Sequence, residues 1–327
     1  MPLVPEPTGE GPAVGRQELL GRSREMTYGG TLSFLRRTCT RDLREADIAV
    51  SGIPFDMATS NRPGARLGPR AIRAASVGLA ELDAYPWSFD PFDTVAVADY
   101  GDCHLDFGHP ESAPAQIEAH ADAILASDTM MVTLGGDHFV TYPLLRAHAK
   151  KHGPISLVHF DAHSDTWDDD GDRLDHGSMF LRAAREGIIE PATSVQVGIR
   201  TANEHDHGFT IIGAPWVHRE GIASTLEVIT EVVGDRAAYL TFDIDCLDPA
   251  FAPGTGTPVA GGLSTAQALE AVRGLGHLDI VGMDVVEVAP AYDVGEITAL
   301  AAATIAHDFI CLQAIRAGAR PQSYGRQ

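Results

Sequence analysis

The chain has 327 residues, of which 44% are hydrophobic and 21% are charged. This ordinary globular composition excludes a disordered or fibrous chain and leaves enough apolar residues for a large core. Its 24 basic and 45 acidic residues give a net charge of −21, which disfavours nucleic acid and anionic membrane as partners and favours small cations.

The N-terminal region predicts neither export nor a membrane anchor. Residues 1–30 mix proline, glycine and polar residues without periodicity, so we expect an N-terminal arm or tail. They contain no basic residue followed by an apolar run, and we find no apolar stretch of about 18 residues elsewhere. The four cysteines are far apart and form no CxxC pair, which favours a reducing, cytoplasmic location.

From about residue 46, short apolar runs alternate with segments of helical spacing. The runs are rich in β-branched residues and bounded by Gly or Asp, as in buried parallel strands; they lie at 48–53, 94–98, 130–134, 155–160, 194–199, 238–242 and 280–286. Amphipathic segments, which predict helices, lie at 112–126, 142–152, 179–186, 226–233 and 264–274. This alternation predicts that residues 31–327 form a single α/β sandwich with helices on both faces of the sheet.

Polar residues directly follow three of these predicted strands. His138 follows the run at 130–134 on a glycine-rich turn, and the next run is followed by Asp161, His163 and Asp165 at alternate positions. Alternate side chains of an extended backbone share a face, and ligands of open parallel sheets bind at the carboxyl ends of the strands. Asp243 and Asp245 follow the run at 238–242. We therefore expect all six side chains to meet at one metal-binding site.

The ligand set indicates the kind of metal and the number of ions. Carboxylates and imidazoles suit Mn²⁺, Zn²⁺, Ni²⁺ or Co²⁺, and the absence of a thiolate argues against a structural zinc site. Four carboxylates exceed what one ion needs, so we expect two bridged ions about 3.5–4 Å apart. A lone Asp-x-Asp or a lone histidine is more often structural; their occurrence after three strands favours the metal site.

Two further residues could complete a hydrolytic site. His176 follows the aspartate-rich loop 166–174 and could relay a proton to a leaving amine. Glu287 ends the run 280–286 and could bind a planar cation through two parallel hydrogen bonds. Taken alone, His176 could equally be a surface histidine, and Glu287 could be the partner of an arginine.

Three segments resemble the signatures of the ureohydrolase family, which includes arginases and agmatinases. They are Gly-Gly-Asp-His at 135–138, Asp-Ala-His-Ser-Asp at 161–165 and Thr-Phe-Asp-Ile-Asp-Cys-Leu-Asp-Pro at 241–249. The resemblance covers most of the chain, and the segments 56–60 and 286–293 are more similar to bacterial agmatinases than to arginases. It implies a three-layer α/β/α sandwich with a mainly parallel sheet of about eight strands, assembled as a trimer or hexamer.

The resemblance also implies roles for the site residues. One Mn²⁺ would be held by His138, Asp161, Asp165 and Asp243, and the other by Asp161, His163, Asp243 and Asp245. His176 would act as the proton shuttle, Glu287 as the guanidinium anchor, and Asp165 as acceptor of a hydrogen bond from the attacking hydroxide. Mn²⁺ is the metal we expect, with Ni²⁺ or Co²⁺ as alternatives.

The expected reaction is the hydrolysis of agmatine to putrescine and urea. The aspartates of the loop 166–175, in particular Asp168, Asp169 and Asp170, would bind the distal cation of agmatine, and we count Thr257 among the substrate-binding residues. The loops 166–175 and 201–217 are where we expect the choice of substrate to be set.

Three alternatives remain open. The chain could act on another guanidine, such as guanidinobutyrate, guanidinopropionate, free guanidine or a biguanide. A deacetylase of the same fold would use one zinc ion and a catalytic tyrosine, which the full ligand set for two metals disfavours. A non-catalytic partner of an active homologue would release no urea.

Overall fold

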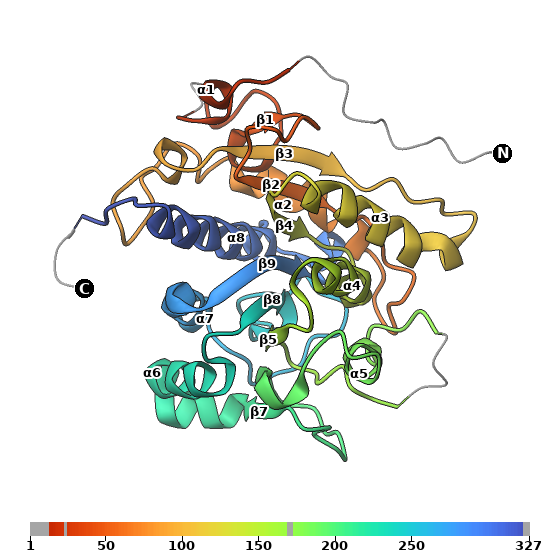
Figure 1. Ribbon diagram of the computed structural model, residues 1–327. Helices are drawn as coiled ribbons and strands as arrows, with labels where there is room; N and C mark the ends of the chain where they lie inside the picture. Colours follow the sequence, from red (N-terminus) through yellow and green to blue (C-terminus); the bar gives the residue numbers. More distant parts are fainter. Residues whose placement is uncertain (1–12, 23–24, 169–172, 323–327) are drawn as a thin grey trace.

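The computed structural model describes residues 13–22, 25–168 and 173–322. Within this part of the chain, nine strands form one sheet and eight α-helices accompany it (Figure 1). The strands are β1 (Thr38–Cys39), β2 (Ile48–Gly52), β3 (Val97–Asp102), β4 (Met130–Leu134), β5 (Ser156–Phe160), β6 (Val195–Ile199), β7 (Thr210–Gly213), β8 (Ala237–Asp243) and β9 (Asp279–Val286). The helices are α1 (Arg16–Leu19), α2 (Gly68–Ser76), α3 (Ala113–Leu125), α4 (Thr141–His152), α5 (Met179–Arg185), α6 (Ala214–Val233), α7 (Thr265–Gly274) and α8 (Ile297–Arg316).

All neighbouring strands run parallel, in the order β1-β3-β2-β4-β9-β8-β5-β6-β7. The last strand along the chain, β9, therefore lies between β4 and β8 in the middle of the sheet. Every residue of β2, β5 and β6 is buried, because helices cover both faces of a parallel sheet. This is why their sequences are continuous apolar runs rather than alternating ones.

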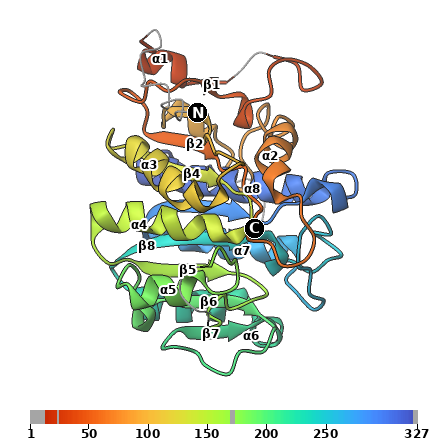
Figure 2. The ribbon, with the colours of Figure 1, turned by 90° about the vertical axis from the view of Figure 1, so that its right-hand side faces the viewer.

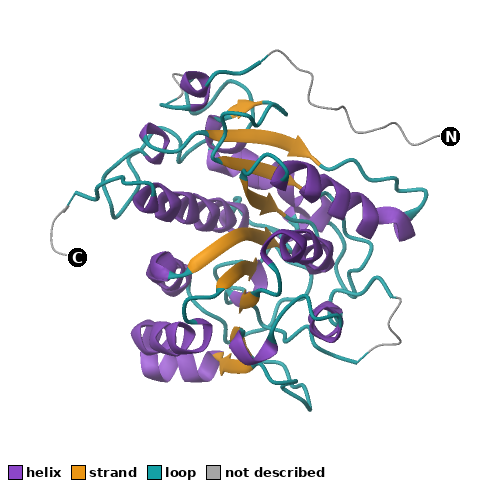
Figure 3. Ribbon diagram, viewed as in Figure 1, coloured by secondary structure: helices purple, strands orange, loops and turns teal. Residues whose placement is uncertain are grey.

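Helices cover the sheet on both sides and make three layers, as the sequence predicted. Helices α3, α4 and α5 lie on one face, and α2, α6, α7 and α8 on the other (Figures 1 and 2). In Figure 3 the strands lie between these two groups of helices. Helix α8 is long and apolar enough to cross a membrane, but 78% of its apolar window is buried inside the protein, so it is a core helix.

All seven predicted runs are strands, although β3 begins at Val97 rather than at residue 94. The sheet has nine strands instead of about eight because the short edge strands β1 and β7 extend it. Helices α1, α2 and α8 were not predicted, and α1 lies within the segment expected to be an arm or tail. The predicted helix at 226–233 is the second half of α6, which begins at Ala214 and is interrupted at Gly221, where φ is 85°.

The described part of the expected N-terminal arm is attached to the domain. Leu19 in α1 is only 1% exposed and belongs to the core on the α3 side of the sheet. The backbone N–H of Val14 donates to Asp42 at 3.0 Å, and Arg16 forms an ion pair with Asp47 at 2.6 Å. Residues 1–12, 23 and 24 of the predicted arm lie outside the described residues.

Candidate metal centre

Four adjacent strands bring the predicted site residues together. In the order β4-β9-β8-β5, these parallel strands end at the same edge of the sheet. His138 follows β4, Glu287 follows β9, Asp243 ends β8, and the segment 161–165 follows β5. Residues almost 150 positions apart in the sequence therefore meet because their strands are neighbours, as expected for ligand sites in α/β sheets.

The imidazole of His138 faces three carboxylates. Its Nδ1 atom lies 2.9 Å from Oδ2 of Asp161, 2.9 Å from Oδ2 of Asp165 and 3.2 Å from Oδ2 of Asp243. All four side chains are buried. Two ligand atoms that bind one ion at about 2.1 Å and near a right angle lie about 3 Å apart, so this spacing fits a shared divalent metal.

A second group of ligand atoms adjoins the first. Nδ1 of His163 lies 3.3 Å from Oδ1 of Asp161 and 3.2 Å from Oδ2 of Asp245. The two carboxylate oxygens of Asp161 thus face different imidazoles, His138 and His163. Two ligand groups that share one aspartate match the donor set of a binuclear site. The structure brings together all six predicted ligands.

The carboxylates of this cluster repel one another. Burial raises the pKa of Asp243 well above its ordinary value, and the charges of Asp245 and Asp161 raise it further. Burial and the charge of Asp161 likewise raise the pKa of Asp165 and of Asp245. Such a cluster is costly without cations, so its chemistry fits divalent metal ions.

Asp161 differs from the other carboxylates because imidazoles surround it. Burial acts to raise its pKa, but His159, His138 and His163 together hold the pKa of Asp161 well below its ordinary value. His159 was not among the predicted residues. It is fully buried on β5, and its Nε2 lies 2.8 Å from Oδ2 of Asp161. Positions 159, 161, 163 and 165 alternate, so extending the predicted pattern two residues upstream would have found it.

Asp165 and Glu287 have positive φ angles of 51° and 65°. Residues other than glycine rarely adopt this left-handed region, and when they do they cluster at functional sites. In both cases the positive φ comes where the chain leaves the ligand segment or the strand. Two of the eight described non-glycine residues with positive φ therefore carry carboxylates of this site.

His176 and Glu287 form a pair beside the carboxylates. Nδ1 of His176 lies 2.8 Å from Oε1 of Glu287, which also accepts the backbone N–H of His138 at 2.9 Å. Oε2 of Glu287 is buried and finds no hydrogen-bond partner among the residues that the structure describes. The backbone N–H and hydroxyl of Ser60 lie 3.0 Å and 2.8 Å from Nε2 of His176. Because a backbone N–H can only donate, Nε2 accepts, and the proton of the neutral ring is on Nδ1.

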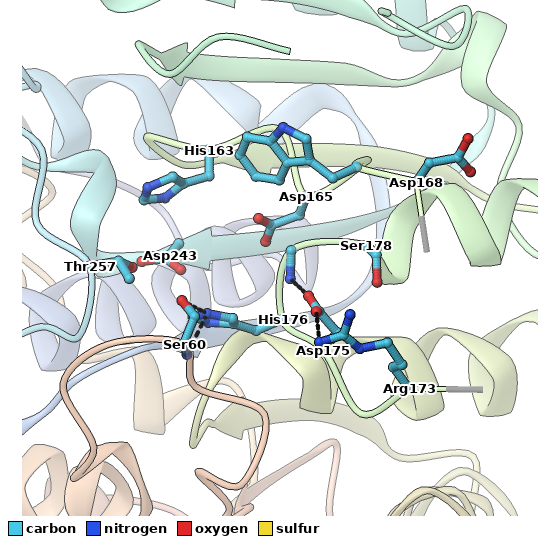
Figure 4. A pocket seen from close by; sticks show the side chains of 12 residues that line it. Ser60, His163, Asp165, Asp168, Arg173, Asp175, His176, Ser178, Asp243 and Thr257 are labelled. Carbon is cyan, nitrogen blue, oxygen red and sulfur yellow. Dashed lines mark hydrogen bonds and ion pairs between the residues drawn. The ribbon is translucent and has the colours of Figure 1, made fainter. Parts of the chain in front are cut away.

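A pocket of about 300 Å³ opens onto these residues. In Figure 4, His163, Asp165 and Asp243 reach it from one side, and His176 and Ser60 from the other. Trp167 also lines it, with its ring centroid 6.2 Å from that of His163. Neither Ser60 nor Trp167 was predicted, because a single serine or tryptophan in a loop carries no distinctive spacing.

The predicted substrate-binding residues have mixed positions. Asp168 lines the pocket, and its carboxylate binds Nη2 of Arg185 at 2.6 Å. Thr257 also lines the pocket, but its hydroxyl donates to Oδ2 of Asp245 at 3.1 Å. Asp169 and Asp170 lie outside the described residues. Glu287 is 1% exposed, at the inner end of the site rather than on the pocket wall.

Known proteins resemble this chain over most of its length. A model of the arginase family matches residues 46–311. An agmatinase of Chromobacterium violaceum is 60% identical over 93% of this chain and 95% of its own. A solved structure of a hypothetical agmatinase from Burkholderia thailandensis is 62% identical, covers 93% of this chain and 97% of its own, and has a TM-score of 0.91. The structure of the proclavaminate amidino hydrolase from Streptomyces clavuligerus is 38% identical, covers 89% of this chain and 99% of its own, and has a TM-score of 0.84.

Proposed function

The chain belongs to the arginase family, and from this premise we propose that it hydrolyses agmatine to putrescine and urea. The observation that carries the proposal is the pair of ligand groups that share Asp161, directly beside a buried glutamate, one oxygen of which has no hydrogen-bond partner among the described residues. The resemblance to agmatinases at 60% and 62% identity supports agmatine as the substrate.

We propose that two divalent ions, most simply Mn²⁺, occupy this site. His138, Asp161, Asp165 and Asp243 would hold one ion, and Asp161, His163, Asp243 and Asp245 the other. When bound, such a pair of ions makes a nucleophilic hydroxide available at neutral pH. The buried carboxylate of Asp165 would orient this nucleophile by accepting a hydrogen bond from it.

Glu287 would bind the guanidinium group of the substrate. Its Oε1 is held by His176 and by the backbone of His138, so its orientation is fixed before substrate arrives. Its Oε2 is buried and has no partner in the part of the chain that the structure describes, which is costly, and a guanidinium N–H would satisfy it. A Cβ atom at Gly256 would lie only 3.2 Å from this oxygen, so glycine there keeps the approach to Oε2 open.

His176 would transfer a proton to the leaving amine. Burial acts to lower the pKa of His176. The hydrogen bond to Glu287 and the negative charge of Glu287 nevertheless raise the pKa of His176 to about 9. The positively charged ring is therefore accessible at neutral pH. A proton on Nε2 would oppose the N–H of Ser60, so this form requires the ring and the Ser60 segment to separate. That separation would free the Nε2–H for the substrate.

We further propose that acidic residues at the mouth of the pocket favour the distal ammonium of agmatine. Asp168 and Asp175 line the pocket, and the net charge of −21 attracts cations. Replacing Asp168, Asp169 and Asp170 by Asn should raise the KM for agmatine and leave kcat nearly unchanged. An unchanged KM would show that this loop does not bind the tail.

One observation favours a different guanidine as the alternative substrate. Arg173 also lines the pocket, and its guanidinium could bind the carboxylate of guanidinobutyrate or guanidinopropionate. Urea release should therefore be measured with agmatine, arginine, both guanidino acids, guanidine and a biguanide. We expect agmatine to give the highest kcat/KM. A higher value for a guanidino acid would reassign the substrate, and no urea from any compound would favour a non-catalytic role.

Metal content distinguishes this proposal from the deacetylase alternative. Elemental analysis after loading with Mn²⁺ should give two ions per chain, whereas one bound zinc ion would favour a deacetylase. Reconstitution with Ni²⁺ and Co²⁺ would rank the metals by kcat/KM. We also propose a cytoplasmic homo-oligomer, a trimer or a hexamer, which light scattering on the purified protein would test.

A further inference from the structure

Asp284 is a fully buried carboxylate that is not one of the metal ligands. It lies on β9, paired in register with Thr241 on β8. Three hydroxyl groups donate to it: Thr241 Oγ1 to Oδ1 at 2.6 Å, and Thr141 Oγ1 and Tyr239 Oη to Oδ2 at 2.9 Å and 3.1 Å. No basic side chain is among these partners. The arrangement satisfies an ionised carboxylate, because all three partners are placed as donors.

Thr241 connects this carboxylate to the metal centre. Its Oγ1 lies 2.8 Å from Nε2 of His138. A hydroxyl group has one proton, and that of Thr241 is directed to Asp284, so Thr241 can only accept from His138. The proton of the His138 ring is therefore on Nε2. Nδ1 then presents its lone pair to Asp161, Asp165 and Asp243, where a metal ion would bind.

The charge of Asp284 decides the direction of this chain of hydrogen bonds. If Asp284 carried a proton and donated it to Thr241, the threonine would donate to Nε2 of His138. The ring proton would then be on Nδ1, and the nitrogen that faces the three carboxylates could not bind a metal. An ionised Asp284 excludes this arrangement, although two hydrogen bonds separate it from the His138 ring.

We propose that Thr241 and Asp284 are positioning residues, which fix the tautomer and orientation of the His138 ring and thereby raise its affinity for the metal. The inference rests on the proposed metal centre. Partners of this kind, one bond beyond the metal ligand, typically change metal affinity about 10- to 100-fold. Neither residue touches the pocket, so their effect on the reaction would be exerted only through His138.

Thr141 offers a matched control for Thr241. Both hydroxyls are fully buried and donate to the same carboxylate, but only Thr241 contacts His138. The substitutions Thr241→Val and Thr141→Val have the same chemistry and keep the β-branched shape. Thr241→Ser keeps the hydroxyl group. Both valine variants lose a hydrogen bond to Asp284, but only Thr241→Val also loses the contact with His138. A difference between them in metal affinity therefore reports on the contact with His138.

The test is the Mn²⁺ affinity of each full-length variant, measured by competition with a fluorescent chelator. We expect Thr241→Val to bind one Mn²⁺ about 10- to 100-fold more weakly, and Thr141→Val and Thr241→Ser to stay within about 3-fold of the wild type. Thermal denaturation of the metal-free proteins should show similar losses for the two valine variants. At saturating Mn²⁺, urea release by Thr241→Val should recover substantially.

Two outcomes would overturn the inference. Equal Mn²⁺ affinity of Thr241→Val and Thr141→Val would show that the link to His138 does not matter. Loss of Mn²⁺ by Thr241→Ser as large as by Thr241→Val would show that the hydroxyl is not the relevant group. In both cases the wild type would still bind Mn²⁺ and release urea, whereas failure of the wild type to do so would refute the proposed function itself.

Discussion

His176 donates from Nδ1 to Oε1 of Glu287 at 2.8 Å, across 111 positions of the sequence. This bond joins the proposed proton carrier to the proposed guanidinium anchor. A change in either residue should therefore alter both proton transfer and substrate binding. A single substitution at either residue should therefore not affect proton transfer alone or substrate binding alone.

Replacement of Glu287 by Gln should lower kcat/KM for agmatine about 10- to 100-fold, the usual effect of losing a hydrogen bond to a charged group. Without the negative charge, the pKa of His176 should fall from about 9. The measurement is the dependence of kcat/KM on pH for both proteins. Wild-type Mn²⁺ content in the variant would be the control. An unchanged kcat/KM would contradict the role of Glu287 as anchor.

His159 should contribute to metal binding through Asp161. Its Nε2–H donates to Oδ2 of Asp161, and its Nδ1 has no partner in the described part of the chain. Replacement by Phe keeps a buried ring but removes this donor, so we expect Mn²⁺ to be held about 10-fold more weakly. Gln can donate from its amide and should restore part of the affinity. Equal Mn²⁺ content of the His159→Phe and His159→Gln variants after dialysis would contradict this role.

Arg200 fixes the segment that carries Asp245. Its guanidinium group donates to the backbone carbonyls of Asp245 at 2.6 Å, Val259 at 2.7 Å and Cys246 at 3.2 Å. Lysine cannot reproduce this planar set of donors, so Arg200→Lys should lower stability by about 2–3 kcal/mol. The measurement is the thermal midpoint with and without Mn²⁺.

A surface arginine provides the comparison for Arg200. Arg219 forms an exposed ion pair with Glu220 at 2.8 Å, and such pairs contribute about 0–1 kcal/mol. Arg219→Lys should therefore leave the thermal midpoint nearly unchanged. Equal losses in the two variants would mean that the carbonyl contacts of Arg200 are not important.

Metal loading should release protons. Burial and mutual repulsion raise the pKa of Asp243, Asp245 and Asp165 in the metal-free site. Burial acts to lower the pKa of His163, but Asp161 and Asp245 raise it to about 12. Metal ions bind the deprotonated ligands, so loading must displace protons from this cluster. We expect release of about one proton or more per chain at pH 7, and Mn²⁺ affinity that increases with pH. Calorimetric titration in buffers of different ionisation enthalpy measures the release. An identical binding enthalpy in all buffers would contradict it.

His148 should make the protein sensitive to acid. Burial lowers the pKa of His148 to about 4, so the unfolded chain, with an ordinary pKa near 6.5, binds the proton first as the pH falls. Its contribution is present above pH 6.5 and is lost between pH 6.5 and 4, at a cost of about 3 kcal/mol. His148→Gln should lose less stability over this range in urea denaturation of the metal-free protein. Parallel losses in both proteins would refute the prediction.

The sequence could predict that the six proposed ligands lie together, because each follows an apolar run that ends at the same edge of the sheet. It did not predict α8, because a helix buried nearly all round has no amphipathic pattern. The edge strands β1 and β7 have only two and four residues, too few for a recognisable period. The lengths and ends of the central strands were predictable because burial on both faces selects continuous apolar runs.

The contacts that extend the site across the sheet could not be read from spacing. Thr241 and Asp284 meet because β8 and β9 pair in a particular register, and no local pattern specifies which residues of two distant strands lie opposite each other. The same holds for Ser60 and His176. Sequence motifs indicate which side chains could bind a metal. The order and register of the strands show which neighbouring side chains orient those ligands by hydrogen bonds.

The position of β9 also bears on how the protein is made. Among the nine described strands this one is synthesised last, yet it lies between β4 and β8, carries Asp284 and leads to Glu287. A nascent chain that ends before residue 279 lacks the strand that joins His138 to Asp243. Capture of the metal ions should therefore follow the synthesis of β9, which makes metal retention a signature of nascent chains that extend past residue 287.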